Sequence, residues 1–243
     1  MASSIPLRPV AEPHCNECSL VALCMPRELT DAELIKVDQI VTRGRTLHAG
    51  EALFRQGDPA LSIYSLRSGA LKSTAVSDKG QEQVTAFHLP GEMVGLSASE
   101  GDAYPVTTLA LDTSAVCEVS FARLDNLSAY MPTLRRHFLR LMSREIRDSQ
   151  QMMLLLSKKT AEQRMATLLL DLSARYRTRG YSATSFRLSM SRHDIADYLG
   201  LAVETVSRVL TRFAQAGLIA VDGKQIDFLI APGDFFARVE EEF

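Results

Sequence analysis

The sequence predicts an α+β fold: an antiparallel β-roll first, then one long helix, then a winged helix-turn-helix. Three observations predict this order. Short β-rich runs separated by glycines occupy residues 45–122, residues 132–157 have no internal Gly or Pro, and residues 187–217 have the spacing of two helices joined by a glycine turn. With 243 residues, 46% of them hydrophobic, the chain can form one large or two ordinary domains around a buried core.

Residues 187–217 carry the strongest local signals. Ser191 is placed to cap a helix, and Asp194 follows three residues later as the acid of a capping box. Gly200 ends this helix, and a second helix is expected over 203–216. Its apolar residues recur at helical spacing and are expected to face the core; they are Val206, Val209, Leu210 and Phe213.

The opposite edge of the second helix is polar. Glu204, Ser207 and Arg208 lie three and four residues apart, so they share one face in the first turns, where a recognition helix contacts base edges. Arg can bind guanine with two hydrogen bonds, Glu can accept from cytosine N4, and Ser can contact a base or a phosphate. A solvated Glu204–Arg208 ion pair is the alternative interpretation. The spacing of the whole unit favours binding of double-stranded DNA.

The segments around this unit agree with DNA binding. An amphipathic helix over 161–177 and a loop precede it, and β-rich runs on either side of Asp222-Gly223 predict the hairpin of a wing. Residues 158–212 hold ten Lys or Arg and five Asp or Glu, although the whole chain has a net charge of −2. This local basic excess favours contact with phosphate, but it is small.

The first half of the chain is expected to be mostly β. A short helix over 30–42, capped at Thr30, precedes the roll. No alternation of strands and helices indicates a parallel sheet, and turns with glycine separate the apolar runs. The expected strands lie at residues 52–54, 62–66, 70–76, 83–89, 107–112 and 114–121.

Residues 132–157 predict one long helix with an apolar seam. The seam follows the alternating steps of three and four residues that are typical of a two-stranded coiled coil. A helix packed only on its own domain is the alternative, and a homodimer is favoured because a helix-turn-helix usually binds two half-sites as a pair. The expected dimer interface consists of Leu139, Met142, Ile146, Ser149, Met153 and Leu156.

The chain has four cysteines, three of them within ten residues. Cys15 and Cys18 form a C-x2-C pair, Cys24 follows, and Cys117 stands alone in an expected strand. Four thiolates are the ligand set of a [4Fe–4S] cluster or of tetrahedral zinc, and the spacing alone leaves both open. For Cys117 by itself, an inert buried thiol is the alternative.

Several function classes are disfavoured. The N-terminal segment lacks the continuous apolar stretch of a signal peptide, and no window offers the ~18 uncharged apolar residues of a membrane span, so a cytoplasmic location is expected. The five histidines are scattered, with no partnered Ser or carboxylate spacing, so we do not expect an enzyme. An iron–sulfur redox enzyme or electron carrier is the alternative from another class, but the chain shows no cofactor motif beyond the cysteines.

Roll, long helix and winged helix-turn-helix, in that order over residues ~30–230, resemble the cyclic-AMP receptor protein superfamily of bacterial transcription regulators. Within it the chain resembles the oxygen-sensing fumarate and nitrate reduction regulator (FNR) branch. The four cysteines, the run MLLLSKK at 153–159 and GLAVETVSR at 200–208 carry this resemblance. A regulator that uses zinc or thiol oxidation is the alternative within the same class.

The FNR resemblance implies one [4Fe–4S] cluster per subunit, which oxygen converts to a [2Fe–2S] form and then removes. Leu20, Val21 and Leu23 are expected to shield it. The intact cluster is expected to promote dimerisation and binding to TTGAT-type inverted repeats, activating or repressing genes of anaerobic metabolism. The residues carried over are the ligands Cys15, Cys18, Cys24 and Cys117 and the base-contacting Glu204, Ser207 and Arg208.

The resemblance also bears on partners. RNA polymerase is an expected partner, with the loop 77–80 as a candidate activating region or an ordinary hairpin turn. Nucleotide-binding rolls place a Glu and an Arg-Ser or Arg-Thr pair around the cyclic phosphate. Here Glu92 is retained, but Tyr104-Pro105 stands where the pair would be, so no cyclic nucleotide is expected.

One seam position departs from the FNR pattern. FNR has an aspartate where this chain has Ser149, so like-charge repulsion across the seam is reduced and dimerisation should depend less on the cluster. Together these expectations divide the chain into a cysteine-rich cluster-binding segment 1–29, a β-roll sensor domain 30–131, a dimerisation helix 132–157, a winged helix-turn-helix domain 158–231 and a C-terminal tail 232–243.

Overall fold

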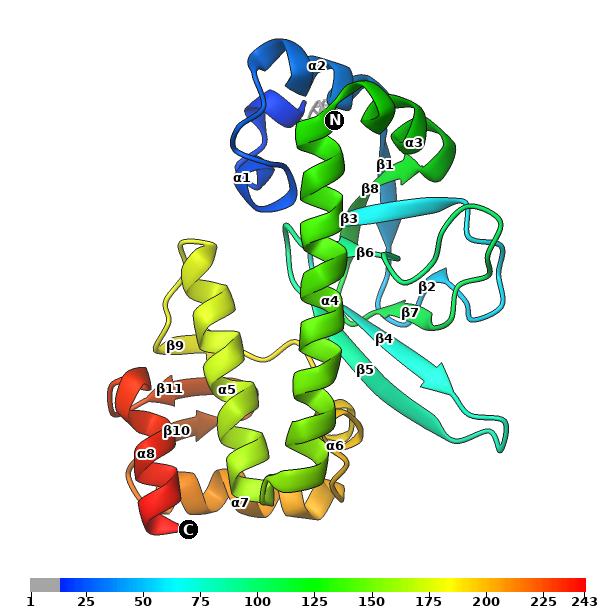
Figure 1. Ribbon diagram of the computed structural model, residues 1–243. Helices are drawn as coiled ribbons and strands as arrows, with labels where there is room; N and C mark the ends of the chain where they lie inside the picture. The colour runs from blue at the N-terminus through cyan, green and yellow to red at the C-terminus, as the bar shows by residue number, and fades with distance from the viewer. Residues whose placement is uncertain (1–13) are drawn as a thin grey trace, which may run out of the picture.

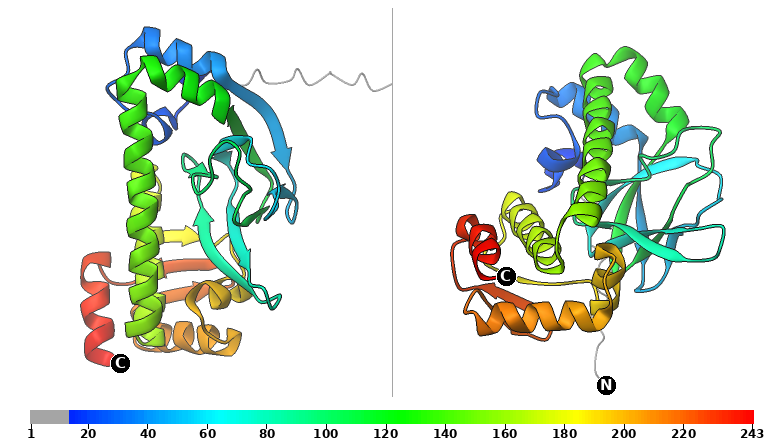
Figure 2. Two further views of the ribbon diagram at one scale, coloured as in Figure 1. Left: turned by 45° about the vertical axis from the view of Figure 1, so that its right-hand side comes forward. Right: turned by 60° about the horizontal axis from the view of Figure 1, so that its bottom comes forward.

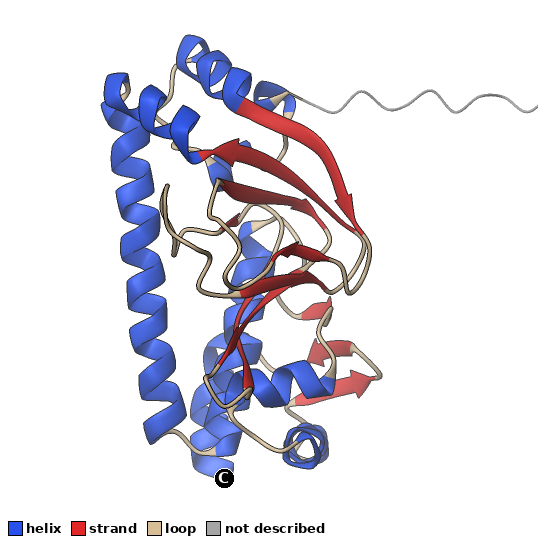
Figure 3. Ribbon diagram, turned by 90° about the vertical axis from the view of Figure 1, so that its right-hand side faces the viewer, coloured by secondary structure: helices blue, strands red, loops and turns tan. Residues whose placement is uncertain are grey.

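The computed structural model describes residues 14–243. Residues 1–13 of the predicted cysteine-rich segment 1–29 therefore lie outside the described residues. Helix α4 (Pro132–Lys158) runs the length of the molecule, with the β-roll on one side and the C-terminal elements at its lower end (Figures 1 and 3). This arrangement is the predicted α+β fold.

Three short helical elements precede the roll: η1 (Cys15–Glu17), α1 (Val21–Cys24) and α2 (Asp31–Ile40). Thr30 caps α2 in a reciprocal capping box, because its side chain accepts the Glu33 N–H and the Glu33 carboxylate accepts the Thr30 N–H. The helix ends two residues earlier than predicted, since residue 41 already begins a strand.

In the described part of the chain the roll has two four-stranded antiparallel sheets, ordered β1-β8-β3-β6 and β2-β7-β4-β5. All six predicted runs form strands, whereas the first and sixth strands were not predicted. The strands are β1 (Val41–Leu47), β2 (Ala52–Phe54), β3 (Ser62–Ser68), β4 (Leu71–Val76), β5 (Glu82–His88), β6 (Met93–Val94), β7 (Thr107–Ala110) and β8 (Ser114–Ser120).

Aromatic side chains fill part of the roll interior. Phe54 stacks on Tyr104 with ring centroids 3.8 Å apart, and Tyr64 lies against the same Phe54 ring at 5.9 Å. The Tyr104 hydroxyl donates to the Ser62 carbonyl at 2.5 Å, so its polar end is satisfied inside the core. Tyr104 is therefore a core residue of the roll.

Helix α3 (Phe121–Tyr130) leads into α4, which begins at Pro132 in the first-turn position that proline favours. The predicted seam of α4 is largely exposed within one chain: Leu139 is 53% exposed, Ile146 60% and Met153 64%. Leu156, the last seam position, is instead half-buried against the C-terminal core.

The C-terminal domain, residues 161–242, contains four helices and three strands (Figure 2). The sheet order is β10-β11-β9, so the predicted loop before the helix-turn-helix contributes an unpredicted third strand. The elements are α5 (Ala161–Thr178), β9 (Ser185–Arg187), α6 (Arg192–Leu199), α7 (Val203–Gln215), β10 (Ile219–Asp222), β11 (Gln225–Phe228) and α8 (Pro232–Glu242).

Two details of this domain differ from prediction. Asp222 pairs with Gln225, so the two-residue turn is Gly223-Lys224, one residue later than predicted. Gly223 has φ +57°, as a turn with glycine at its first central position requires. Residues 232–243, predicted only as a tail, form α8, which packs on α5 and buries Phe235 against the Phe213 ring.

Candidate DNA interface and cysteine pocket

The helix-turn-helix forms as its local signals predict. The Ser191 hydroxyl accepts the Asp194 N–H at 3.1 Å, and the Asp194 carboxylate accepts the Ser191 N–H at 2.8 Å. Gly200 ends α6 in the left-handed region with φ 61°. The predicted inward residues of α7 are all buried; they are Val206, Val209, Leu210 and Phe213.

The polar edge of α7 is exposed. Glu204, Ser207 and Arg208 are all solvent-exposed near the start of the helix. Arg208 Nη2 donates to Thr205 Oγ1 at 3.0 Å, and among the residues described here no ion pair joins it to Glu204. The structure thus presents the three candidate base-contacting side chains together on one face, and within residues 14–243 their only hydrogen-bond partners lie in their own helix.

Two cations near the wing were not singled out from the sequence. Arg192 Nη2 donates to the Gly223 carbonyl at 2.8 Å, and Lys224 Nζ donates to the Ser189 carbonyl at 2.8 Å. Both lie where the wing turn meets the first turn of α6. The position of Lys224 directly after the turn glycine Gly223 was the sequence signal that could have indicated a positive charge on the wing.

All four cysteines line one pocket between the N-terminal helices and the roll. Cys15 and Cys18 lie in and after η1, Cys24 ends α1, and Cys117 lies in β8 opposite Ser65 of β3. The structure therefore gathers the predicted ligand set from two distant segments. The apolar lining consists of Leu20, Val21, Met25, Val41, Leu66, Met93 and Val119.

The spacing of these thiols bears on what they can hold. Across residues 14–243, no three His, Cys, Asp or Glu side chains are arranged to hold a single metal ion. Tetrahedral zinc needs four donors at ~2.3 Å from one ion. The thiolates of a [4Fe–4S] cluster each bind a different iron, and four cysteines around one pocket are a suitable ligand set for such a group.

Burial controls the protonation of the pocket thiols. It raises the pKa of Cys15 to about 12, with a further increase from Asp38, and it raises the pKa of Cys24 to about 11, with a further increase from Cys18. Both thiols are therefore protonated at neutral pH when no cation is bound, and binding of a metal group would release protons.

Asp38 of α2 holds the first cysteine turn in place. Its Oδ1 accepts the Cys15 N–H at 2.7 Å, its Oδ2 is 2.7 Å from His14 Nδ1, and it pairs with Arg43. Arg43 also donates to Cys15 Sγ at 3.3 Å. Although burial opposes it, hydrogen bonds from Cys15 and His14 lower the Asp38 pKa to about 2. Nothing in the local sequence marked Asp38 for this role.

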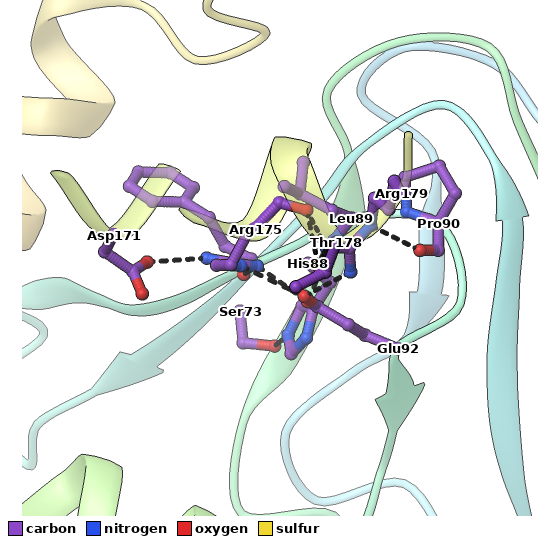
Figure 4. Close-up of polar contacts among 10 residues, drawn as sticks. Ser73, His88, Leu89, Pro90, Glu92, Asp171, Arg175, Thr178 and Arg179 are labelled. Atoms are coloured by element: carbon purple, nitrogen blue, oxygen red, sulfur yellow. Dashed lines mark hydrogen bonds and ion pairs between the residues drawn. The ribbon is translucent and has the colours of Figure 1, made fainter. Parts of the chain in front are cut away.

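Glu92 does not face the roll interior. Its carboxylate pairs with Arg175 and Arg179 of α5, as Figure 4 shows. The one acid retained from nucleotide-binding rolls is thus already paired with two cations of the same chain. Tyr104, at the position of the missing Arg-Ser pair, is buried in the aromatic core.

Comparison with known proteins agrees with both halves of the structure. Residues 44–130 match the family model of the cyclic nucleotide-binding domain, and residues 163–230 match that of the Crp-like helix-turn-helix domain. The solved structure of FixK2 from Bradyrhizobium japonicum is similar, with a TM-score of 0.74 and 30% identity over 83% of this chain and 96% of that one.

A β-roll, a long helix and a winged helix-turn-helix with an exposed polar face define a DNA-binding transcription regulator. The chain is 58% identical to transcriptional activator protein anr of Pseudomonas aeruginosa over 94% of each chain. It is 49% identical to the fumarate and nitrate reduction regulatory protein of Vibrio cholerae, over 89% of this chain and 86% of that protein. It belongs to the FNR branch of the cyclic-AMP receptor protein family and is not an enzyme.

In the part of the chain described, each helix is too short or too polar to span a membrane.

Proposed function

We propose that this protein is an oxygen-responsive transcription regulator whose four cysteines hold one [4Fe–4S] cluster per subunit. The observation that carries the proposal is the convergence of Cys15, Cys18, Cys24 and Cys117 on one mostly apolar pocket. A bound cluster would supply the reactivity towards oxygen. The apolar lining would limit the access of water and oxygen to it.

The positions of the four cysteines suggest how a bound cluster would link two parts of the chain. Three cysteines belong to the segment 15–24 and the fourth to β8, so a group held by all four ties the N-terminal helices to the roll. Leu20 and Val21, two of the three residues expected to shield the cluster, line the pocket. Leu23, predicted as a third shielding residue, instead packs against Gly91 outside it.

The proposed regulator acts as a homodimer on TTGAT-type inverted repeats in the cytoplasm. Support comes from the exposed apolar stripe of α4 and from the exposed Glu204, Ser207 and Arg208. These three side chains would contact base edges, while RNA polymerase would be the partner through which bound protein activates or represses genes of anaerobic metabolism.

The test follows iron and DNA binding in one sample. Anaerobically purified protein is analysed for iron and sulfide by chemical assay and Mössbauer spectroscopy, and DNA binding is measured before and after exposure to air. Wild-type protein and the exposed-residue control Ser19→Ala should hold iron and lose DNA affinity in air, while Cys18→Ala should lose both iron and the response. Iron-free wild-type protein that binds its site equally well in air would disprove the proposal.

A further inference from the structure

The last residue of β5 and the four residues that lead to β6, together called the 88–92 turn, contact two parts of the chain that are far apart in sequence. One is α1 of the cysteine pocket, through Leu23. The other is α5 of the C-terminal domain, through Arg175 and Arg179. Figure 4 shows the second set of contacts, with both arginines and the turn residues His88, Leu89, Pro90 and Glu92 labelled.

The contact with α1 depends on a glycine. Gly91 has φ +87°, and a Cβ atom there would lie 2.8 Å from Cβ and Cδ1 of Leu23, so no side chain fits between them. Leu23 directly precedes the proposed ligand Cys24. The Gly91 N–H donates to the Leu66 carbonyl at 2.7 Å, and Leu66 itself lines the cysteine pocket. The turn is therefore supported by Leu66, which lines the cysteine pocket, and by Leu23, which lies next to Cys24 in α1.

The contact with α5 is an ion cluster. Arg175 donates to Glu92 through Nη2 at 2.6 Å and Nε at 3.0 Å, and Arg179 Nη2 donates to Glu92 at 2.5 Å. Arg175 also donates to the Phe87 carbonyl and Arg179 to the Pro90 carbonyl, each at 2.6 Å. The two guanidinium groups therefore bind the side chain and backbone of the turn and the adjoining backbone of β5.

This cluster ties α5 to the roll. The Arg179 side chain is only 4% exposed, and the loss of one partner from a buried ion pair leaves an uncompensated charge that is costly. Apolar packing continues the interface, because Phe87 contacts Tyr198 of α6 with ring centroids 4.9 Å apart. Since α6 is the first helix of the helix-turn-helix, the end of β5 next to this turn also contacts the DNA-contacting unit.

We propose that the 88–92 turn transmits the state of the cysteine pocket to the helix-turn-helix within a single chain, with Glu92 as the positioning residue. This inference rests on the proposed function, because it requires a pocket whose state depends on oxygen. With α1 in place, Leu23 supports Gly91 and the Glu92 carboxylate holds α5. When α1 moves, the turn loses that support and α5 is less restrained. The route acts in addition to pairing along α4.

The experiment compares wild-type protein, Glu92→Gln and the control Arg177→Gln. Arg177 is an exposed arginine on α5, the helix that carries Arg175 and ends next to Arg179. Iron content, sedimentation, DNA binding and amide hydrogen exchange are measured anaerobically and again after air. Glu92→Gln should keep its iron and dimerise like wild type, but bind DNA about tenfold more weakly. In this variant, air should change exchange over 88–92 but no longer over 171–179. The control should behave as wild type.

The outcomes separate the inference from the proposed function. Equal responses of the 171–179 amides to air in wild type and Glu92→Gln would overturn the inference and leave the proposed function intact. Iron-free wild-type protein would overturn both. If Glu92→Gln does not fold, Arg179→Gln retains the Arg175–Glu92 pair and should weaken the same response; an unchanged response would overturn the inference. Glu92→Asp, which keeps the charge, should restore part of the coupling.

Discussion

Lys72 Nζ of β4 lies 2.7 Å from Asp194 Oδ1 in the first turn of α6, and both side chains are largely buried. The other oxygen of the same carboxylate accepts the N–H and the hydroxyl of Ser191. Although burial opposes it, these partners lower the pKa of Asp194. One aspartate therefore completes the cap of the helix-turn-helix and joins the C-terminal domain to the roll.

This double role predicts unequal losses of stability. Asp194→Ala removes both the cap and the ion pair and should cost about 3 kcal/mol of unfolding free energy. Lys72→Met leaves the cap intact and should cost about half as much, or ~1.5 kcal/mol. Urea unfolding at neutral pH measures both, with Lys79→Met at the exposed hairpin tip as the control. Equal losses would show that the cap contributes nothing.

The helix-turn-helix was predictable because its signals are local. Ser191 and Asp194 are three residues apart, and the apolar spacing of α7 needs no knowledge of the rest of the chain. Strand β6 has two residues, and β9 is a strand only because it pairs with β11. Such elements depend on distant partners, so a search for apolar runs misses them.

The residues of the candidate site likewise fall into a predictable set, marked by local spacing, and an unpredictable set, defined by distant partners. The cysteine spacing predicted a four-thiol set, and the structure places that set around one pocket. The roles of Asp38 and Glu92 could not be predicted, because their partners lie on other elements. Arg175 and Arg179 are more than eighty residues from Glu92 in sequence. Ion pairs over such separations follow from the packing of domains, which no local pattern encodes.

Arg208 provides a test of base recognition. Arg208→Lys keeps the positive charge but loses the planar guanidinium that can bind guanine with two hydrogen bonds. It should weaken binding to a TTGAT-type inverted repeat by about 1–3 kcal/mol while the dependence of affinity on salt stays nearly constant. Binding isotherms at several salt concentrations measure both quantities. A uniform loss on specific and random DNA would instead assign Arg208 to phosphate.

Ser149 provides a test of the seam on α4. It lies exposed between Ile146 and Met153, and its hydroxyl donates to the Glu145 carbonyl at 2.9 Å. Ser149→Asp would place two carboxylates opposite each other in the proposed dimer, so iron-free protein should shift towards monomer. Analytical ultracentrifugation of wild type and variant, with and without iron, measures this. Ser143→Asp is the exposed control on the same helix, and equal shifts would argue against this seam.

His88 predicts a pH dependence of stability. It is buried, with Nε2 2.8 Å from Ser73 Oγ, and burial lowers its pKa from 6.5 to about 4. Below pH 6.5 the unfolded chain binds a proton that the folded chain resists, so the stability that is complete above 6.5 is lost as the pH falls towards 4. Between pH 7.5 and 5 this loss should be about 2 kcal/mol.

Iron-free protein is the sample for this measurement, because the protonation of cluster ligands then makes no contribution. Urea unfolding of wild type at pH 7.5 and 5 gives the total loss, and His88→Gln should reduce it, since glutamine cannot take up a proton. His48→Gln, at an exposed histidine of the same roll, shows whether the removal of any histidine has this effect. An unchanged pH dependence in His88→Gln would mean that the buried ring relaxes towards solvent before it is protonated, and the Ser73–His88 contact would then not persist in acid.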